Sequence, residues 1–490
     1  MLLQSSSAGY VCITASLIEV LYAKDAKAPS KTKTIPMEHK EYIIDIEKIA
    51  FSGKGLGHAE GKTFFVPYVL PGETVHATMR KKRKGVIETN APISITTTST
   101  DRIAPRCKHF TRCGGCSYQH IPYDKQLEIK TAQITEIFRG LDLPKITYPL
   151  SITGAEHTYT YRNKVELSFG FTEERKPVLG FHTPGRFYDI EEIMHCDLIS
   201  ERANRIIQKY RELLFAKELP VYRAKDHSGE LRHLVIREGY MTGEIMVNLV
   251  VQGNVSLDIY REIEQALRKH VPIESSFLTI NTSISDNVQV DSQILLSGND
   301  HIKEKIGEDI FSISPISFFQ TNSHQVTVLY DRVRSLVAQI DLQEKHILEL
   351  YSGTGTISIY LADMVDTSTG VELVPHAVDD AHSNAALNGK TNVSFIAADV
   401  LDLLKEEHSV IREKNILILD PPRAGIHPKA LKLILERGWE HVVYVSCNPT
   451  TLRRDIEEFG SNGYEVVSLE AVDMFPQTYH IEMVCYMRKV

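Results

Sequence analysis

The stretch LELYSGTGTISIYLA, residues 348–362, places Gly353 and Gly355 between an apolar strand pattern and an apolar helix pattern. Glycine permits a tight turn at this place and lets a ligand approach the backbone closely. The same alternation continues along the chain, where helical stretches separate the strand patterns TSTGVEL, NVSFIAAD, NILILDPP and HVVYVSCNP. Residues 341–490 are therefore predicted to form a parallel, doubly wound α/β sheet with right-handed crossovers.

Acidic residues stand at the ends of these strands, and ligands of doubly wound sheets bind beyond the carboxyl ends of the strands. Glu372 ends the second strand, 19 residues after Gly353, where a carboxylate can accept hydrogen bonds from both ribose hydroxyls. Asp399 ends the third strand and can contact an adenine edge. Ser358 replaces the third glycine of the dinucleotide fingerprint, so a smaller adenosine compound, S-adenosylmethionine, is the predicted ligand. Taken singly, each acid is also a common helix N-cap or a solvated loop residue.

Two further residues mark the ends of the fourth and fifth strands. Asp420 begins DPPRAG, where two prolines cannot donate backbone hydrogen bonds and hold an irregular, exposed loop. Cys447 lies in YVSCNPTT, residues 444–451. Buried cysteine is common and usually inert. Beside a methyl-donor site, however, a thiol indicates covalent activation of an acceptor that is itself a poor nucleophile.

A pyrimidine C5 atom is an acceptor of this kind. Addition of a thiolate to C6 lets C5 attack a sulfonium methyl group, after which a base must remove the C5 proton so that the thiol can be eliminated. Glu482 in YHIEMVCYMRKV, residues 479–490, is the candidate base, because its apolar neighbours would raise the pKa of its carboxyl group. The alternative for Glu482 is a surface charge on an edge strand. A pyrimidine must leave its stack to meet these groups, so single-stranded or flipped-out RNA is the expected substrate.

The first part of the chain lacks the alternation of strand and helix patterns found in its last part. Residues 1–38 are predicted to be a poorly ordered extension. Residues 39–98 contain short strand patterns with glycine-rich turns, which favour a small β-barrel with either an RNA-binding or a structural role. The basic run MRKKRKG, residues 79–85, is expected on a loop of this barrel. Because the whole chain has a net charge of -8, any RNA contact must be local, and a solvated loop is the alternative.

Residues 99–340 mix strand and helix patterns and predict an α+β domain that contains most of the cysteines. No apolar run is long enough to span a membrane, so a cytoplasmic protein is expected. The uneven spacing of the 7 cysteines argues against disulfides and for metal binding or catalysis. Zinc, an iron–sulfur cluster and free thiols are the alternatives, and three close thiols with one distant partner favour the cluster. The four cysteines concerned, from CKHFTRCGGCSYQH and IMHCDL, are Cys107, Cys113, Cys116 and Cys196.

The motifs FFQTN, LELYSGTGTIS, DPPRAG, SCNP and HIEMV, in this order, resemble those of the RNA 5-methyluridine methyltransferase family. The resemblance implies a Rossmann-like, S-adenosylmethionine-dependent methyltransferase domain over residues 341–490, with Cys447 as the nucleophile and Glu482 as the proton acceptor. The chain departs from many relatives at Ser352 and Thr356, where those relatives have cysteine and asparagine. The residues that the resemblance places around S-adenosylmethionine and the target base are Gln320, Tyr351, Glu372, Asp399 and Asp420, in addition to the two glycines of the turn.

The resemblance extends to the ribosomal-RNA branch of that family, whose members have a TRAM domain, a small β-barrel that resembles oligonucleotide-binding barrels, and a [4Fe-4S] cluster. It implies a TRAM barrel at residues 39–98 and a cluster held by the four cysteines. The implied substrate is 23S ribosomal RNA with a flipped-out uridine, and no obligate protein partner is implied. Two alternatives remain: the same reaction on transfer RNA, and a noncatalytic protein that binds RNA or assists ribosome assembly.

Overall fold

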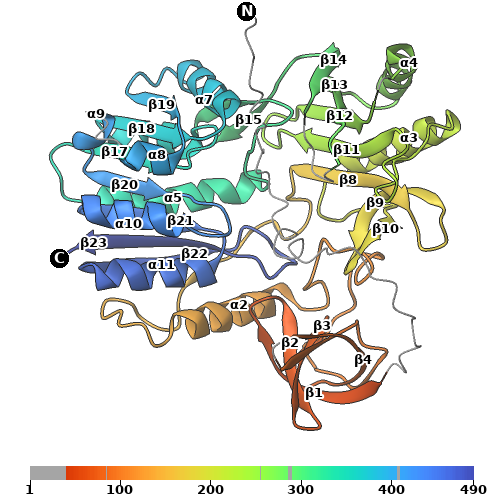
Figure 1. Ribbon diagram of the computed structural model, residues 1–490, viewed down its shortest axis with the longest axis horizontal. Helices are drawn as coiled ribbons and strands as arrows, with labels where there is room; N and C mark the ends of the chain where they lie inside the picture. Colours follow the sequence, from red (N-terminus) through yellow and green to blue (C-terminus); the bar gives the residue numbers. More distant parts are fainter. Residues whose placement is uncertain (1–39, 84, 254, 285–289, 406–408) are drawn as a thin grey trace, which may run out of the picture.

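The computed structural model describes residues 40–83, 85–253, 255–284, 290–405 and 409–490, and the predicted N-terminal extension lies outside them. Figure 1 shows three parts: a small barrel at the bottom, a sheet with helices α3 and α4 at the upper right, and a sheet layered with helices on the left. Within the described residues, no helix is both long and apolar enough to cross a membrane.

The first part is a closed barrel in which β1 pairs with both β2 and β4. The order β1-β2-β3-β5-β4, with β3 parallel to β5, is the topology of an oligonucleotide-binding fold, as predicted. Alternate residues of β1, such as Ile44 and Ile46, point into its core. The strands are β1 Glu41–Ala50, β2 Lys54–Ala59, β3 Lys62–Pro67, β4 Thr74–Arg83, β5 Val86–Thr89 and β6 Ser94–Thr97.

The basic run was expected on a loop, and the structure differs. Arg80, Lys81 and Lys82 continue strand β4, where Lys81 and Lys82 pair with β5. Backbone pairing in a barrel leaves alternate side chains outside. Long, charged side chains therefore extend this strand without entering the core, which a count of charges along the sequence does not reveal.

The second part is a sheet of order β10-β9-β8-β11-β12-β13-β14, mostly antiparallel, with β12 and β13 parallel. Helices α3 (Glu201–Ala216) and α4 (Leu257–Arg268) bury Ile206, Tyr210 and Ile263 in the core that they share with the sheet. The strands are β8 Lys164–Phe171, β9 Pro177–Thr183, β10 Arg186–Glu192, β11 Leu231–Glu238, β12 Ile245–Val251, β13 Ser275–Ile280 and β14 Ser292–Gly298, and the hairpin β15 Ile302–Ile306 with β16 Asp309–Ile313 follows.

The third part is the predicted doubly wound sheet, of order β19-β18-β17-β20-β21-β23-β22-β7. Strands β17 to β21 are parallel, and β23 runs antiparallel between β21 and β22. The order reverses beside β17, which is where such sheets bind ligands. Strands β20 and β21 are buried along their whole length, as expected when helices cover both faces. The strands are β17 His346–Leu350, β18 Thr367–Glu372, β19 Val393–Ala397, β20 Ile416–Leu419, β21 His441–Ser446, β22 Tyr464–Val472 and β23 Glu482–Lys489.

Helices connect these strands and cover the sheet (Figure 1). Helix α11 begins where Asn448 accepts a hydrogen bond from the N–H of Thr450, with Pro449 in the first turn. Helix α10 ends at Gly438 in a left-handed conformation. The helices are α6 Thr356–Leu361, α7 Pro375–Leu387, α8 Val400–Lys405, α9 Ser409–Arg412, α10 Pro428–Arg437 and α11 Pro449–Ser461, with a short 3-10 turn, Ala362–Met364.

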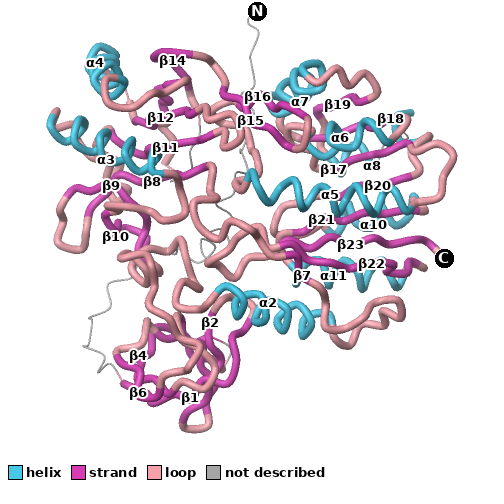
Figure 2. The backbone as a smooth tube through the Cα atoms, turned by 180° about the vertical axis from the view of Figure 1, so that it is seen from behind, coloured by secondary structure: helices cyan, strands magenta, loops and turns pink. Residues whose placement is uncertain are grey.

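Segments that precede residue 341 also belong to this layer. Strand β7 (Ile152–Thr153) pairs in parallel with the end of β22, and helix α2 (Tyr123–Phe138) lies beside α11 (Figure 2). Helix α5 (Ser323–Gln339) shares a hydrophobic core with β21 and β23. The chain therefore leaves the third layer to form the second sheet and then returns to it, so the third layer is assembled from separate stretches of the chain.

Candidate active site

The turn after β17 combines open space with close packing. Gly353 and Gly355 both have left-handed backbones, with φ of 53° and 75°. A Cβ atom at Gly353 would meet nothing within 4 Å, whereas one at Gly355 would lie 2.4 Å from the Phe395 ring. Gly355 is therefore required for packing, and Gly353 leaves room at the mouth of the turn. Tyr351 shares the left-handed conformation and donates its N–H to the Val371 oxygen at 2.9 Å.

Glu372 and Asp399 lie at the ends of the next two strands and fix the backbone there. Glu372 accepts hydrogen bonds from the N–H groups of Gly353 and Val374, both at 3.0 Å. Asp399 accepts from the N–H of Leu401 at 2.8 Å, so it caps α8, which was one of the alternatives to its contact with adenine. Glu372 thereby braces the glycine turn from the neighbouring strand.

Three further carboxyl groups gather at this edge. Burial raises the pKa of Glu349 to about 8 and that of Asp420 to about 7, and it raises the pKa of Glu482 well above its ordinary value. The charge of Asp420 raises the pKa of both glutamates further, which places the three groups close together. Such an edge is poorly suited to an anion and favours a ligand that brings positive charge.

Glu349 is a residue that the sequence analysis missed. It lies inside β17, is 1% exposed, and accepts a hydrogen bond from the N–H of Ser358 at 3.0 Å as well as one from its hydroxyl. The serine at position 358 therefore supports Glu349 beneath the glycine turn. An acid inside an otherwise apolar strand, LELY, is the signal that could have found it.

Cys447 follows β21 directly and faces this acidic edge. Burial raises the pKa of its thiol, the charges of Glu482 and Asp420 raise it further, and Arg423 opposes them. Glu482 is 5% exposed at the start of β23, an inner strand, so the edge-strand alternative for this residue is wrong. Burial therefore favours the protonated forms of the thiol and of the carboxyl group.

Hydrogen bonds join the loops that carry these groups. The Asn448 side-chain amide donates to the Arg423 oxygen at 2.9 Å, which ties SCNP to DPPRAG. The Arg423 guanidinium lies 3.1 Å from Nδ1 of His480, two residues before Glu482. DPPRAG is thus fixed against both SCNP and HIEMV.

Hydrogen bonds also hold the FFQTN segment, residues 318–322, against the glycine turn and two other parts of the chain. Gln320 is half-buried, and its carbonyl accepts a hydrogen bond from the Asn163 side chain at 2.9 Å. Asn322 caps α5 and donates to the Met474 oxygen at 3.0 Å. The Thr354 hydroxyl contacts the Phe318 oxygen at 3.5 Å, so this segment lies over the glycine turn.

The four predicted metal ligands, Cys107, Cys113, Cys116 and Cys196, line one cavity of about 340 Å³. Backbone or side-chain N–H groups lie within 3.4 Å of the first three sulfur atoms. Burial raises the pKa of each thiol, and neighbouring cysteines raise the pKa of Cys113, Cys116 and Cys196 further. In the described part of the chain, no three His, Cys, Asp or Glu side chains are arranged to hold a single metal ion.

Similarity to solved structures defines the class of protein. The structure of Pyrococcus abyssi tRNA (uracil-54, C5)-methyltransferase with S-adenosyl-L-homocysteine matches with a TM-score of 0.72 and 27% identity, covering 91% of this chain and 100% of that one. The fold is that of S-adenosylmethionine-dependent methyltransferases.

Sequence comparison defines the family. The model of the tRNA (Uracil-5-)-methyltransferase family matches residues 122–490. An RNA methyltransferase of Clostridium tetani is 38% identical over 92% of this chain and 98% of its own length. One from Caldanaerobacter subterraneus subsp. tengcongensis is 36% identical over 91% and 98%. The chain belongs to the tRNA (uracil-5-)-methyltransferase family and is an RNA methyltransferase.

Proposed function

We propose that the protein methylates C5 of uridine in RNA through a covalent adduct between Cys447 and C6 of the base. The observation that carries this proposal is the meeting of a thiol and a buried carboxyl group, Cys447 and Glu482, at the strand ends beside the glycine turn. S-adenosylmethionine supplies the methyl group and a sulfonium charge that the acidic edge is suited to receive. Gly353, Glu372 and Asp399 are the proposed contacts to its adenosine part, with Gln320, Tyr351, Gly355 and Asp420 completing the site.

The proposed roles of the two catalytic residues follow from their chemistry. The Cys447 thiol and the Glu482 carboxyl group first release their protons to water, which the sulfonium charge of S-adenosylmethionine favours. The Cys447 thiolate then forms a C–S bond to C6, and the π electron pair of the C5–C6 bond moves toward the C4 oxygen. C5 then bonds to the methyl carbon as the sulfonium C–S bond breaks. The Glu482 carboxylate removes the C5 proton, and the C6–S bond breaks to restore the thiolate. Burial of Glu482 makes it a stronger base than an exposed glutamate.

The first proposed substrate is 23S ribosomal RNA with a flipped-out uridine, and transfer RNA is the second. The barrel at residues 41–97 and the cysteine cavity support the first, through the resemblance to the ribosomal-RNA branch. The Pyrococcus abyssi structure, which is that of a transfer RNA methyltransferase, supports the second because it matches over most of this chain. Similarity over most of the chain therefore does not favour ribosomal RNA over transfer RNA as the substrate.

The test uses the purified protein, S-adenosylmethionine with an isotope-labelled methyl group, and unmodified 23S ribosomal RNA and transfer RNA in parallel. Label in 5-methyluridine from the ribosomal RNA alone supports the first substrate, and label from transfer RNA alone supports the second. Label in neither RNA, with both RNAs still bound, would favour the noncatalytic alternative. Mapping 5-methyluridine in a strain that lacks the gene identifies the position.

We propose further that the cysteine cavity holds a [4Fe-4S] cluster. Four thiols around one cavity, with N–H groups directed at three sulfur atoms, fit a group that four thiolates bind and that hydrogen bonds to sulfur stabilise. The cluster would join the segment of Cys107, Cys113 and Cys116 to Cys196. Methyl transfer moves no net electrons, so the proposed role is structural or RNA-contacting.

Replacing Cys113 with serine is expected to remove this cluster, because one of its four proposed thiolate ligands is lost. Anaerobically purified protein should contain iron and sulfide and absorb visible light through sulfur-to-iron charge transfer, and the variant should lose both and unfold at a lower temperature. Cys485→Ala, a buried cysteine of β23, is the control that should keep its iron. One zinc ion and no iron in the unaltered protein would reject the assignment.

Neutralising the five basic residues of the run Arg80–Lys84 is expected to weaken RNA binding and flatten its dependence on salt. Each lost phosphate contact should reduce the slope of log K against log [salt] by roughly 0.7 to 0.9. Fluorescence anisotropy over a range of salt concentrations measures this slope. Lys217 and Lys269, at the ends of α3 and α4, provide control substitutions. An unchanged slope would mean that the basic run is only a solvated surface.

A further inference from the structure

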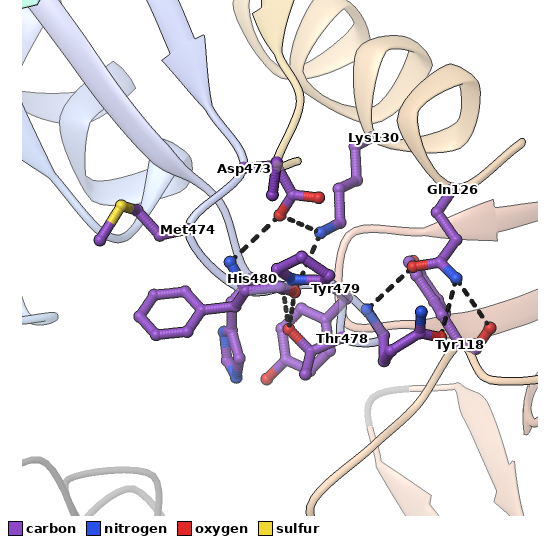
Figure 3. Close-up of polar contacts among 12 residues, drawn as sticks. Tyr118, Gln126, Lys130, Asp473, Met474, Thr478, Tyr479 and His480 are labelled. Atoms are coloured by element: carbon purple, nitrogen blue, oxygen red, sulfur yellow. Dashed lines mark hydrogen bonds and ion pairs between the residues drawn. The ribbon is translucent and has the colours of Figure 1, made fainter. Parts of the chain in front are cut away.

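The segment DMFPQTY, residues 473–479, joins β22 to β23 and ends three residues before Glu482. We call it the 473–479 segment. Loops usually lie on the surface because their backbone groups need partners. Asp473, Met474, Pro476, Gln477 and Thr478 are all buried, however. Their partners come from parts of the chain that are distant in sequence, and Figure 3 shows several of them.

An ion pair fixes the beginning of the segment. Lys130 of α2 lies 2.7 Å from Asp473, and the two side chains are 1% and 0% exposed. Asp473 also accepts hydrogen bonds from the hydroxyl of Tyr123 at 3.0 Å and the N–H of Phe475 at 3.2 Å. Figure 3 shows Lys130 reaching from the helix to Asp473. A buried pair with these additional hydrogen bonds tolerates little displacement, because loss of either partner leaves an uncompensated charge.

Gln477 lies at the centre of the segment in a left-handed conformation, with φ of 67°, and is 3% exposed. Its N–H donates to Oε1 of Gln126 at 2.9 Å, and Nε2 of Gln126 donates to its side-chain oxygen at 3.0 Å. Its carbonyl accepts from the N–H groups of Ser117 and Tyr118, both at 2.9 Å. Ser117 directly follows Cys116, so Gln477 connects α2 to the cysteine segment.

The left-handed conformation of Gln477 is unfavourable for a residue with a side chain in an ordinary loop. Residues held in such conformations persist when the surrounding structure over-determines them, and they concentrate at functional sites. The four hydrogen bonds of Gln477 provide that surrounding structure. The conformation of Gln477 therefore fixes the direction in which the chain continues toward Glu482.

Three more contacts complete the attachment. Asn322 of the FFQTN segment donates to the Met474 oxygen at 3.0 Å, and the Tyr161 hydroxyl donates to the Pro476 oxygen at 3.0 Å. The Tyr479 N–H donates to the hydroxyl of Ser117 at 3.1 Å. FFQTN, the cysteine segment and α2 therefore all converge on the short stretch that leads to Glu482.

We propose that Gln477 is a positioning residue for the base Glu482, and that the 473–479 segment couples the cysteine cavity to the catalytic edge. This proposal rests on the proposed covalent mechanism. Gln477 acts through the backbone of residues 478–481, which places the carboxyl group at the start of β23. The proton-removal step depends on that placement, whereas RNA binding and attack by Cys447 depend on other elements.

Gln477→Gly tests the proposal, because glycine keeps the left-handed backbone and its hydrogen bonds but removes the paired amide. Gln477→Asn is a second variant, since asparagine tolerates the same conformation. Gln133→Ala is the matched control. Gln133 lies on α2, as Gln126 does, and is 4% exposed, but it bonds to Ile49 and Ala50 of the barrel and to the Tyr118 hydroxyl. The variants are compared for kcat, KM for RNA, and the fraction of labelled RNA trapped as protein adduct on denaturing gels.

The expected result for Gln477→Gly and Gln477→Asn is a kcat lower by about tenfold, a KM changed by less than about twofold, and an adduct fraction raised by about tenfold, because a displaced base slows proton removal. Hydrogen exchange at position 477 and at Tyr479 should also rise, because loss of the side-chain hydrogen bond to Gln126 loosens the backbone there. Gln133→Ala should leave all these unchanged, even if it lowers the melting temperature. If Glu482→Gln traps adduct but the two Gln477 variants give the same adduct fraction as Gln133→Ala, the proposed coupling is wrong. Absence of adduct from Glu482→Gln together with loss of its turnover would instead overturn the covalent mechanism.

Discussion

Replacing Cys447 with alanine should abolish methylation of RNA, lowering the rate by a factor on the order of 10⁴ or more. Without the thiol there is no addition to C6, so C5 never gains the electron density to attack a methyl group. The variant should still bind S-adenosylmethionine and RNA, because the glycine turn, Glu372 and the barrel are untouched. Transfer of labelled methyl groups to RNA, together with a binding measurement, separates lost chemistry from lost binding.

Cys485 provides the matched control for this experiment. It lies on β23, opposite Tyr444 of β21, and is 0% exposed. Burial raises the pKa of its thiol as it does for Cys447, so the pKa alone does not distinguish the two cysteines. Position does, because Cys447 lies beyond the strand end and Cys485 lies within the sheet. Cys485→Ala should keep its activity, and full turnover by Cys447→Ala would reject the proposed nucleophile.

The sequence predicted the core of the catalytic sheet because parallel strands with covered faces have a simple pattern. Residues such as Ile416–Leu419 form short, continuous apolar runs between amphipathic helices. It did not predict β7, whose residues Ile152 and Thr153 are too few to show any periodicity. Helix α5 was placed with the central part because it precedes residue 341, although its apolar face packs on β21 and β23. Periodicity reports local structure but not the sheet that a helix covers.

Part of the candidate site followed from the same rule. The carboxyl ends of parallel strands meet at one edge, so the sequence alone was enough to place Glu372, Asp420 and Cys447 together. Glu349 was not predicted as a site residue because it lies within the apolar part of a strand. The role of Gln477 was not predicted because no sequence pattern indicates a glutamine with a left-handed backbone. Its conformation depends on partners such as Gln126, which is 351 residues away along the chain.

Replacing Glu482 with glutamine should produce a different failure from that of Cys447→Ala. Glutamine keeps the size of the side chain but cannot accept the C5 proton, so addition and methyl transfer proceed while elimination slows by roughly 10² to 10⁴-fold. The side chain is 5% exposed, which limits access of water as a substitute base. The protein should therefore stall as a covalent adduct with methylated RNA. Labelled RNA should migrate slowly on a denaturing gel.

The double variant Cys447→Ala with Glu482→Gln decides whether that adduct has the proposed bond. If the Cys447 sulfur forms the bond to RNA, the slow band disappears in the double variant and persists when Glu482→Gln is combined with Cys485→Ala. The methyl group provides a second check, because the trapped RNA should contain label from S-adenosylmethionine in equal amount to the adduct. An adduct without label would place the block before methyl transfer, and Glu482 would then act earlier than proposed. Rapid turnover by Glu482→Gln would assign proton removal to another group, and Asp420, whose pKa of about 7 suits a base near neutral pH, would be the next residue to test.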